Sequence, residues 1–196
     1  MKLHLGCGTV YLRGWVNVDV PSDYTYLAME RPDLVEQYMT NEEQGYYARH
    51  KDKTLDKLRA GPLKQESVCD RYGTFAELPA RSNSVSEILA RHVFEHMSIR
   101  EADQSLHEVR RVLQPRGILR LDVPDHEGTM KAFQETRDSF YIRHLLGPRR
   151  GDRGYHVMSY TPKRLKSLVE AHGFLCLGDE PNPHLYPAFT LRFEKR

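Results

Sequence analysis

The 196-residue sequence predicts an α/β fold in which helices pack on a mostly parallel sheet of seven strands. Three observations support this prediction. Short apolar segments at residues 3–5 and 15–18 lie on either side of a glycine-containing turn. Strand-like segments then alternate with amphipathic helices through the middle of the chain. The last segment, residues 189–194, alternates apolar and polar side chains, as a half-buried strand does.

The first turn has features of a nucleoside-binding turn. Gly6 and Gly8 have no Cβ atom, so the backbone can turn sharply there and approach a ligand closely. Asp19 ends the second strand, where a carboxylate can accept hydrogen bonds from a ribose diol. Tyr11 stands where the dinucleotide fingerprint has a third glycine, which favours a nucleoside ligand without phosphates. The alternative interpretation is an ordinary tight turn after a strand.

Residues 3–8 together with Asp19 resemble motif I and the following acidic position of class I S-adenosylmethionine-dependent methyltransferases. The segments LHLGCG and GWVNVD are similar to the small bacterial methyltransferases, type 11-like, that begin LxLGCG…GWxNVD. This resemblance implies a Rossmann-like class I methyltransferase fold with an antiparallel C-terminal strand, and S-adenosylmethionine as the cofactor. Only residues 9–13 separate Gly8 from Gly14, so we expect a vestigial first crossover helix.

Two later segments carry the same resemblance. Residues 78–96 are similar to the family's LPfxdnSfDxI…shvLEH segment, with Ser86 in place of the usual Asp. Residues 109–124 resemble EhxRVLkPGGxLxhxvP, with Arg116 in place of one glycine. The resemblance implies a cofactor pocket at the strand ends, with either of two acids, at 70 or 77, meeting the adenine. The cofactor-binding residues that we expect are Gly6, Cys7, Gly8, Asp19, Asp70, Glu77, Leu78, Arg91 and His92.

Regular elements are expected through the rest of the chain. Further strands are expected at residues 67–70, 85–90, 118–123 and 174–177. Ser98 and Glu101 form a capping box that opens a helix with one apolar stripe. Residues 129–146 predict a second helical stretch, and Thr161 with Pro162 begins a third helix.

We expect residues 1–196 to form a single domain. Residues 21–66 interrupt the alternation of strands and helices with a polar, Tyr-rich sequence. This segment has helix-like stretches at 33–38 and 41–58 and no visible strand pattern. Because an insertion after the second strand lies on the ligand side of an α/β sheet, we interpret it as a helical, lid-like insertion. A surface excursion with solvated charges is the alternative.

Composition restricts the kinds of partner. The net charge of +2 gives no global field that selects nucleic acid or a membrane surface. Three widely separated cysteines indicate free thiols in a reducing compartment, so the predicted location is cytoplasmic. No apolar run approaches the ~20 residues of a membrane span.

The ten histidines raise the question of a metal site. His92 and His96 are four residues apart, a spacing that places two side chains on one face of a helix. However, we expect a strand to run to about Arg91, and no HExxH pattern is present. We therefore expect no metal site.

A general base helps methyl transfer to a hydroxyl acceptor, and histidine suits neutral pH. By resemblance, His156 matches a histidine that often precedes the family's "yt…L…aGF" segment; His126 and His96 are the other candidates. The alternative for His156 is a buried, hydrogen-bonded histidine of a loop. A flexible basic loop before His156 is expected to bind an acidic acceptor, with a merely solvated basic loop as the alternative. Its basic residues are Arg143, His144, Arg149, Arg150 and Arg153.

The predicted function is S-adenosylmethionine-dependent methyl transfer to a small-molecule or glycan-type acceptor, by O-methylation. One alternative is a methyltransferase-like module that binds the cofactor without catalysis, favoured by the short first connection and by Ser86. Another is a nucleotide-sugar or NAD-linked enzyme. Tyr11 in the glycine turn and the absence of a Ser-x-x-x-Tyr-x-x-x-Lys constellation argue against it.

Overall fold

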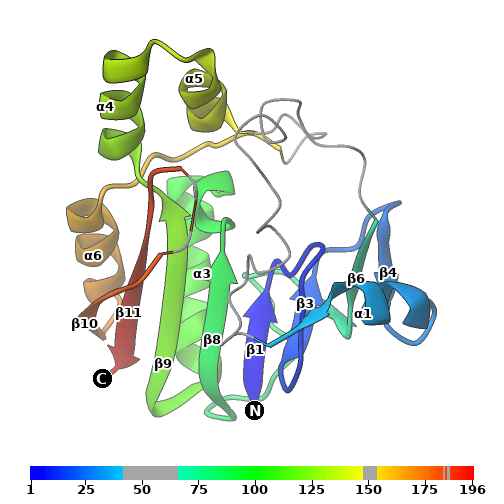
Figure 1. Cartoon of the computed structure of the whole chain (residues 1–196). Coiled ribbons are helices and arrows are strands. Elements are labelled where there is room, and N and C mark those ends of the chain that lie inside the picture. The colour runs from blue at the N-terminus through cyan, green and yellow to red at the C-terminus, as the bar shows by residue number, and fades with distance from the viewer. Residues whose placement is uncertain (42–65, 148–153, 183, 185) are drawn as a thin grey trace.

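The computed structural model describes residues 1–41, 66–147, 154–182, 184 and 186–196. The main sheet contains β1 (Lys2–Leu5), β3 (Val16–Asp19), β7 (Arg71–Tyr72), β8 (Val85–Arg91), β9 (Leu113–Pro124), β10 (Phe174–Glu180) and β11 (Ala188–Lys195). Their order is β10-β11-β9-β8-β1-β3-β7 (Figure 1). Neighbouring strands pair in parallel except at β11, which is antiparallel to β9 and to β10. The predicted seven-stranded, mostly parallel sheet with an antiparallel C-terminal strand is confirmed.

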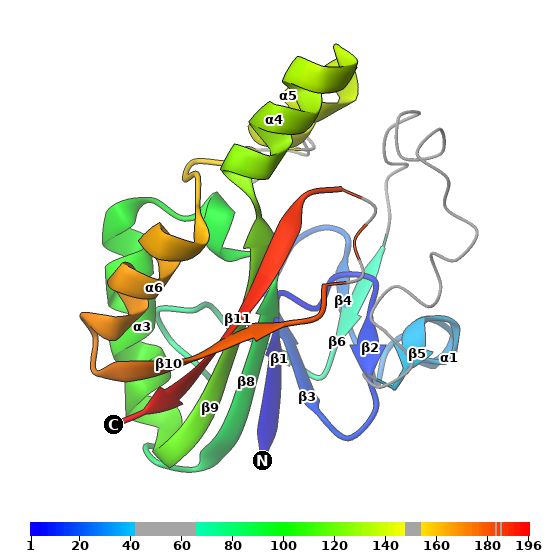
Figure 2. The same ribbon diagram turned by 60° about the vertical axis from the view of Figure 1, so that its left-hand side comes forward.

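Two amphipathic helices cover one face of this sheet (Figure 2). They are α3 (Ile99–Val112) and α6 (Pro162–Glu170). The expected capping box begins α3, because the Ser98 side chain accepts from the Glu101 amide and the Glu101 side chain accepts from the Ser98 amide. Thr161 caps α6 by accepting from the Arg164 amide, and Pro162 occupies its first turn.

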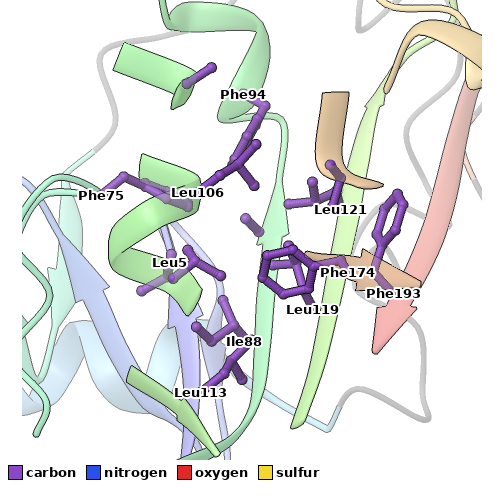
Figure 3. Close-up of a cluster of buried hydrophobic side chains, with 14 of the residues drawn as sticks. Leu5, Phe75, Ile88, Phe94, Leu106, Leu113, Leu119, Leu121, Phe174 and Phe193 are labelled. Carbon is purple, nitrogen blue, oxygen red and sulfur yellow. The ribbon is translucent and has the colours of Figure 1, made fainter. Parts of the chain in front are cut away.

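The core lies between this face and the two helices. Figure 3 shows Leu5, Ile88 and Leu119 of the sheet beside Leu106 of α3, and each is at most 1% exposed. Complete burial of such a side chain stabilises the fold by roughly 1.5–3 kcal/mol. Because side chains alternate along a strand, the intervening residues point to the opposite face, which carries charged groups such as Arg120.

The connection from β1 to β3 contains no helix within the described residues, as the short spacing predicts. It contains the two-residue strand β2 (Tyr11–Leu12), which pairs with β5 (Met39–Thr40). A second small sheet joins β4 (Thr25–Leu27) to β6 (Ser67–Cys69). These two small sheets and α1 (Pro32–Tyr38) flank the β3 side of the main sheet (Figure 1).

The expectation that residues 21–66 contain no strand is wrong, since β4 and β5 lie there. Strands of two or three residues are too short to show an alternating pattern, which explains the error. The helix expected at 33–38 is present as α1. Residues 42–65, which include most of the second helix-like stretch, lie outside the described part, so the lid-like role stays a prediction.

The strand expected at residues 67–70 was placed in the wrong sheet. Residues 67–69 form β6, which pairs with β4, whereas β7 supplies the edge strand beside β3. The Asp70 side chain explains the division, because its Oδ2 accepts a hydrogen bond from the Asn17 backbone amide, 2.7 Å away. Asp70 thereby separates the two short strands.

Two helices lie beyond the upper ends of β8 and β9 in Figure 1, where the single stretch 129–146 was expected. They are α4 (His126–Thr136) and α5 (Ser139–Leu146). Arg137, at φ 55°, ends α4 in the left-handed conformation, and the Asp138 side chain caps α5 by accepting from the Phe140 amide. No helix in the described part of the chain is long and apolar enough to span a bilayer.

Candidate functional site

The glycine turn follows β1 directly and is tied to the end of β3. The Gly6 amide donates to the Val18 carbonyl at 2.9 Å. Both glycines have positive φ, 65° at Gly6 and 53° at Gly8, where a Cβ atom is disfavoured. A Cβ on Gly6 would lie 2.4 Å from Val93 Cγ2, whereas one on Gly8 would meet nothing within 4 Å. Gly6 therefore permits close packing, and Gly8 adjoins open space that a ligand can enter.

Asp19 lies directly on this turn. Its Oδ2 accepts from the Gly8 amide at 2.8 Å, and its Oδ1 accepts from the Val20 amide at 2.8 Å. Cys7, between the glycines, is fully buried, and its Sγ lies 3.4 Å from the Val68 carbonyl oxygen. Burial and the nearby Asp19 carboxylate raise the pKa of the Cys7 thiol well above its usual value. Cys7 is therefore a neutral packing group, and not a nucleophile.

The two acids considered for adenine differ in their surroundings. Asp70 Oδ2 accepts from the Asn17 backbone and side-chain amides, at 2.7 and 3.2 Å, and Oδ1 accepts from the Tyr11 hydroxyl. Burial and this contact with Asp70 raise the pKa of Tyr11, so its hydroxyl stays protonated and donates. Glu77 is solvent-exposed. Leu78 is 4% exposed and donates its amide to Glu108. Asp70 thus holds the connection between β1 and β3 in place through its hydrogen bonds, whereas Glu77 remains on the surface.

Arg91 ends β8, His92 follows it, and β8 pairs with β1 on the other side from β3. The structure therefore brings the glycine turn, Asp19 and these two residues to neighbouring positions at one edge of the sheet. His92 adopts a left-handed conformation, φ 54°, and its amide donates to the Asp122 carbonyl at 2.8 Å. Positive φ is uncommon for residues other than glycine, and here the ring lies against Asp122 of β9 and against His184 and Tyr186 of the loop before β11.

The ring of His92 enters a group of polar side chains that we call the histidine cluster: His92, Glu95, Asp122, His184 and Tyr186. His92 Nδ1 lies 3.1 Å from Glu95 Oε1, and Nε2 lies 2.9 Å from His184 Nε2. His184 Nε2 lies 3.1 Å from Asp122 Oδ1. The Tyr186 hydroxyl lies 3.3 Å from His92 Nε2.

Two buried carboxylates set the charge of the cluster. Burial would raise the pKa of Glu95, but the hydrogen bond and charge of His92 lower it. Burial likewise opposes ionisation of Asp122, and the contacts with His184 and His92 lower its pKa. The pKa of His92 is raised, because these carboxylates outweigh the effect of its burial. His184 has a lowered pKa through burial. Of the two histidines of the cluster, His92 is therefore the one whose surroundings favour the protonated form.

His156, the expected base, lies next to Glu95 of this cluster. Its side chain is 9% exposed, and its Nε2 is 4.0 Å from Glu95 Oε1. Burial lowers its pKa to about 4, so the ring is neutral at pH 7. His96 instead places Nδ1 2.9 Å from the Tyr155 carbonyl oxygen, and His126 is the first residue of α4.

The expected basic loop is only partly described. Arg143 and His144 lie in the last turn of α5. The His144 ring lies 4.2 Å, between centroids, from that of Tyr186, and burial lowers its pKa to about 3. Arg149, Arg150 and Arg153 lie outside the described residues.

Several members of the histidine cluster were not predicted from the sequence. Asp122 gives only a weak signal, since it alternates with the apolar residues Leu121 and Val123 within an expected strand. His184 and Tyr186 follow a proline-containing loop with no recognisable pattern.

The strand order, together with the glycine turn after β1 and the acid at the end of β3, defines a class I methyltransferase fold. The chain belongs to the family described as methyltransferase domain, whose profile matches residues 3–121, more than half of the sequence. No curated protein sequence matches the chain.

Solved structures with low sequence identity share the fold. A SAM-dependent methyltransferase from Methanosarcina mazei is 14% identical with a TM-score of 0.54, over 99% of this chain and 91% of that one. Magnesium protoporphyrin IX methyltransferase from Synechocystis PCC 6803, solved with bound SAH, is 12% identical with a TM-score of 0.52, over 100% and 74%. A possible histamine N-methyltransferase from Thermotoga maritima is 13% identical with a TM-score of 0.53, over 100% and 81%.

Proposed function

We propose that this protein transfers the methyl group of S-adenosylmethionine to a hydroxyl oxygen of a small-molecule or glycan-type acceptor. One observation carries the proposal: the glycine turn and the histidine cluster adjoin each other at the carboxyl edge of the sheet. Val93 follows His92 directly and packs against Gly6. A cofactor on the turn would therefore present its methyl group next to side chains suited to proton transfer.

The cofactor half of the proposal rests on Asp19 and the turn. A carboxylate that already accepts from the Gly8 amide is placed to accept from a ribose diol that enters the open space beside Gly8. We assign direct contacts with the cofactor to the residues that line this edge, and the adenine amine to Glu77. These residues are Gly6, Gly8, Asp19, Glu77, Leu78, Arg91 and His92, whereas Cys7, which is fully buried, is assigned a packing role within the turn. We assign Asp70 a positioning role, because it holds the connection that carries the turn.

The acceptor half rests on His156. A general base must be neutral before it accepts a proton, and the lowered pKa of His156 meets that condition at pH 7. The Glu95 carboxylate, 4.0 Å from Nε2, would stabilise the imidazolium that forms. The proton thus leaves the acceptor hydroxyl for His156 while the oxygen bonds to the methyl carbon and the sulfonium becomes a neutral thioether. In-line placement of the two reactants supplies much of the rate.

An acidic acceptor follows from the basic segment that begins at Arg143. Arginine binds carboxylate or phosphate bidentately, so this segment would hold an acidic sugar or a phosphorylated small molecule near His156. We propose no nucleic-acid acceptor, given the net charge of +2.

The experiment that tests the function is a radiolabelled-methyl assay with fractionated cell extract, followed by the same assay on variants. His156→Ala should lower kcat by roughly 10²-fold or more. His107→Ala is the matched control, because His107 is an exposed histidine of α3. Arg149→Ala combined with Arg150→Ala should raise KM and leave cofactor affinity unchanged. If His156→Ala turns over like the parent, the assigned base is wrong.

A module that binds the cofactor without catalysis is the second candidate. The lack of a helix between Gly6 and β3 favours it, because the segment that would meet the methionine end of the cofactor is shorter than a usual crossover. Tight binding of S-adenosylhomocysteine, with no label transferred to any fraction, would favour this module over the enzyme.

A further inference from the structure

We propose that His92, His184 and Asp122 form a binding site for one divalent transition-metal ion such as zinc. This site goes beyond the proposed methyl transfer and does not depend on it. It runs against the expectation of no metal site, which rested on spacing within single segments. The three residues instead come from the end of β8, from β9, and from the loop between β10 and β11.

The geometry of three atoms carries the proposal. His92 Nε2 and His184 Nε2 are 2.9 Å apart, His184 Nε2 is 3.1 Å from Asp122 Oδ1, and His92 Nε2 is 3.5 Å from the same oxygen. With metal–ligand bonds of about 2.0–2.2 Å, donor atoms around a tetrahedral or octahedral ion lie roughly 2.8–3.6 Å apart. All three observed distances fall within that range, so one ion can be reached by all three atoms.

The chemistry of the donor set also fits. Two imidazoles and one carboxylate on one side of an ion, with the other positions open, is a recurrent arrangement for zinc and non-haem iron. The Asp122 and His184 side chains are 0% and 1% exposed, and His92, at 21%, provides a path for the ion from solvent. The carboxylate supplies a negative charge that compensates part of the charge of the ion.

The surrounding residues orient the ligands as metal sites require. In a ligating histidine, the N–H of the second ring nitrogen usually donates a hydrogen bond to a carboxylate or carbonyl group, which fixes the tautomer. Glu95 Oε1 occupies that place for His92, 3.1 Å from Nδ1. The Thr190 hydroxyl donates to Asp122 Oδ2 at 3.3 Å, and Asn182 Oδ1 accepts from the His184 backbone amide. Glu95 and Thr190 thus hold ligands in place from outside the site.

One nearby cation opposes the ion. Arg91 Nη1 lies 3.8 Å from Asp122 Oδ2. This guanidinium faces Oδ2, whereas Oδ1 is the oxygen nearest to both histidine nitrogens. The alternative without a metal is a hydrogen-bonded network between His92 Nε2, His184 Nε2 and Asp122 Oδ1. In that network each hydrogen bond needs a proton on one of the two atoms that it joins.

Two other groups of histidines and acids are weaker candidates. The first group consists of Glu95, His96 and His156. Its His156 Nε2 is 4.0 Å from the Glu95 carboxylate, and its His96 Nδ1 faces the Tyr155 carbonyl oxygen. The surface group consists of Asp103 and His107 of α3 together with His172. Both ring nitrogens of His172 already have protein partners, Leu168 and Asp103. The second group serves as an internal control.

The test uses the full chain, stripped with a chelator and dialysed, and titrated with zinc alone by calorimetry and with cobalt(II) alone by visible absorption. We expect one ion per chain in the histidine cluster. Asp122→Asn and His184→Ala should each weaken binding by more than about 100-fold, and Glu95→Gln by about 10- to 100-fold, as loss of an outer-shell partner does. His107→Ala, in the surface group, should leave this ion unchanged.

Three results would overturn the proposal. The first is no stoichiometric binding of zinc or cobalt, which would leave a hydrogen-bonded network only. The second is binding that His107→Ala removes, which would place the ion at the surface group. The third is binding that His184→Ala leaves intact. His184 lies in a loop, so its variant decides the matter if Asp122→Asn fails to fold.

Discussion

The glycine turn and the histidine cluster lie side by side at one edge of the sheet, yet they are built in opposite ways. The turn is mostly backbone, and its single charged group, Asp19, is fixed by the amides of Gly8 and Val20. The cluster is made of side chains from segments far apart in sequence, and its charges compensate one another. The site proposed to bind the nucleoside is thus encoded locally, whereas the groups proposed to act on an acceptor are assembled only by the complete fold.

The largest effect expected within the turn is on Gly6. Gly6→Ala should destabilise the protein by roughly 2–4 kcal/mol, because its Cβ would meet Val93 at 2.4 Å in a left-handed backbone conformation. Gly8→Ala, with the same backbone strain and no contact, should cost roughly 1–2 kcal/mol. Urea unfolding of both variants measures the difference. Equal losses would show that Val93 does not constrain the turn.

The next effect concerns the cofactor. Asp19→Ala removes a charged acceptor for two hydroxyls, so binding of S-adenosylhomocysteine should weaken by roughly 1.5–3 kcal/mol, or about ten- to a hundred-fold. Glu95→Gln, in the histidine cluster, is the control and should leave this affinity nearly unchanged. Calorimetry on both folded variants checks the prediction. A loss of affinity in Glu95→Gln alone would show that the cofactor binds at the histidine cluster and not at the glycine turn.

The variant Asp70→Asn distinguishes a positioning role of Asp70 from direct contact with the cofactor. Asp70→Asn should destabilise the fold by roughly 1–3 kcal/mol, since Asn17 and Tyr11 lose a charged hydrogen-bond acceptor. Cofactor affinity of the folded fraction should fall less than in Asp19→Ala. Thermal unfolding and calorimetry on the same preparation measure the two effects. An affinity loss as large as that of Asp19→Ala, with full stability, would make Asp70 a direct ligand.

The last effect depends on pH and on His4, a histidine of β1. His4 is fully buried and bonded to Asn17, and burial lowers its pKa to about 4. Below about pH 6.5 the unfolded chain therefore binds a proton at His4, whereas the folded chain does not. The free energy of unfolding consequently falls as the pH drops toward 4. His4 should account for about 2 kcal/mol of the loss between pH 7.5 and pH 5. Urea unfolding of His4→Gln should show a correspondingly smaller loss, and an equal loss would contradict the prediction.

The same contrast explains what the sequence revealed. The turn, Asp19 and the capping box of α3 depend on residues within about a dozen positions of one another, so the sequence alone identifies them. His92 meets His184 across 92 positions and Asp122 meets His184 across 62, so no local spacing pointed to them. His156 was found only through a family resemblance, and its burial behind Glu95 depends on packing between distant segments. Asp70 shows a further limit, because an acid at a strand end has the same pattern whether it binds a ligand or a neighbouring loop.

Calorimetric titration with S-adenosylhomocysteine, in the presence and absence of NAD, determines whether this protein binds the methyl-transfer cofactor. We predict a micromolar dissociation constant, about −8 kcal/mol, that a large excess of NAD leaves unchanged. The ribose diol is common to both ligands, but the turn has Tyr11 where a pyrophosphate-binding turn has glycine. Tighter binding of NAD, or no binding of S-adenosylhomocysteine to the folded protein, would contradict the assignment of this edge to methyl transfer.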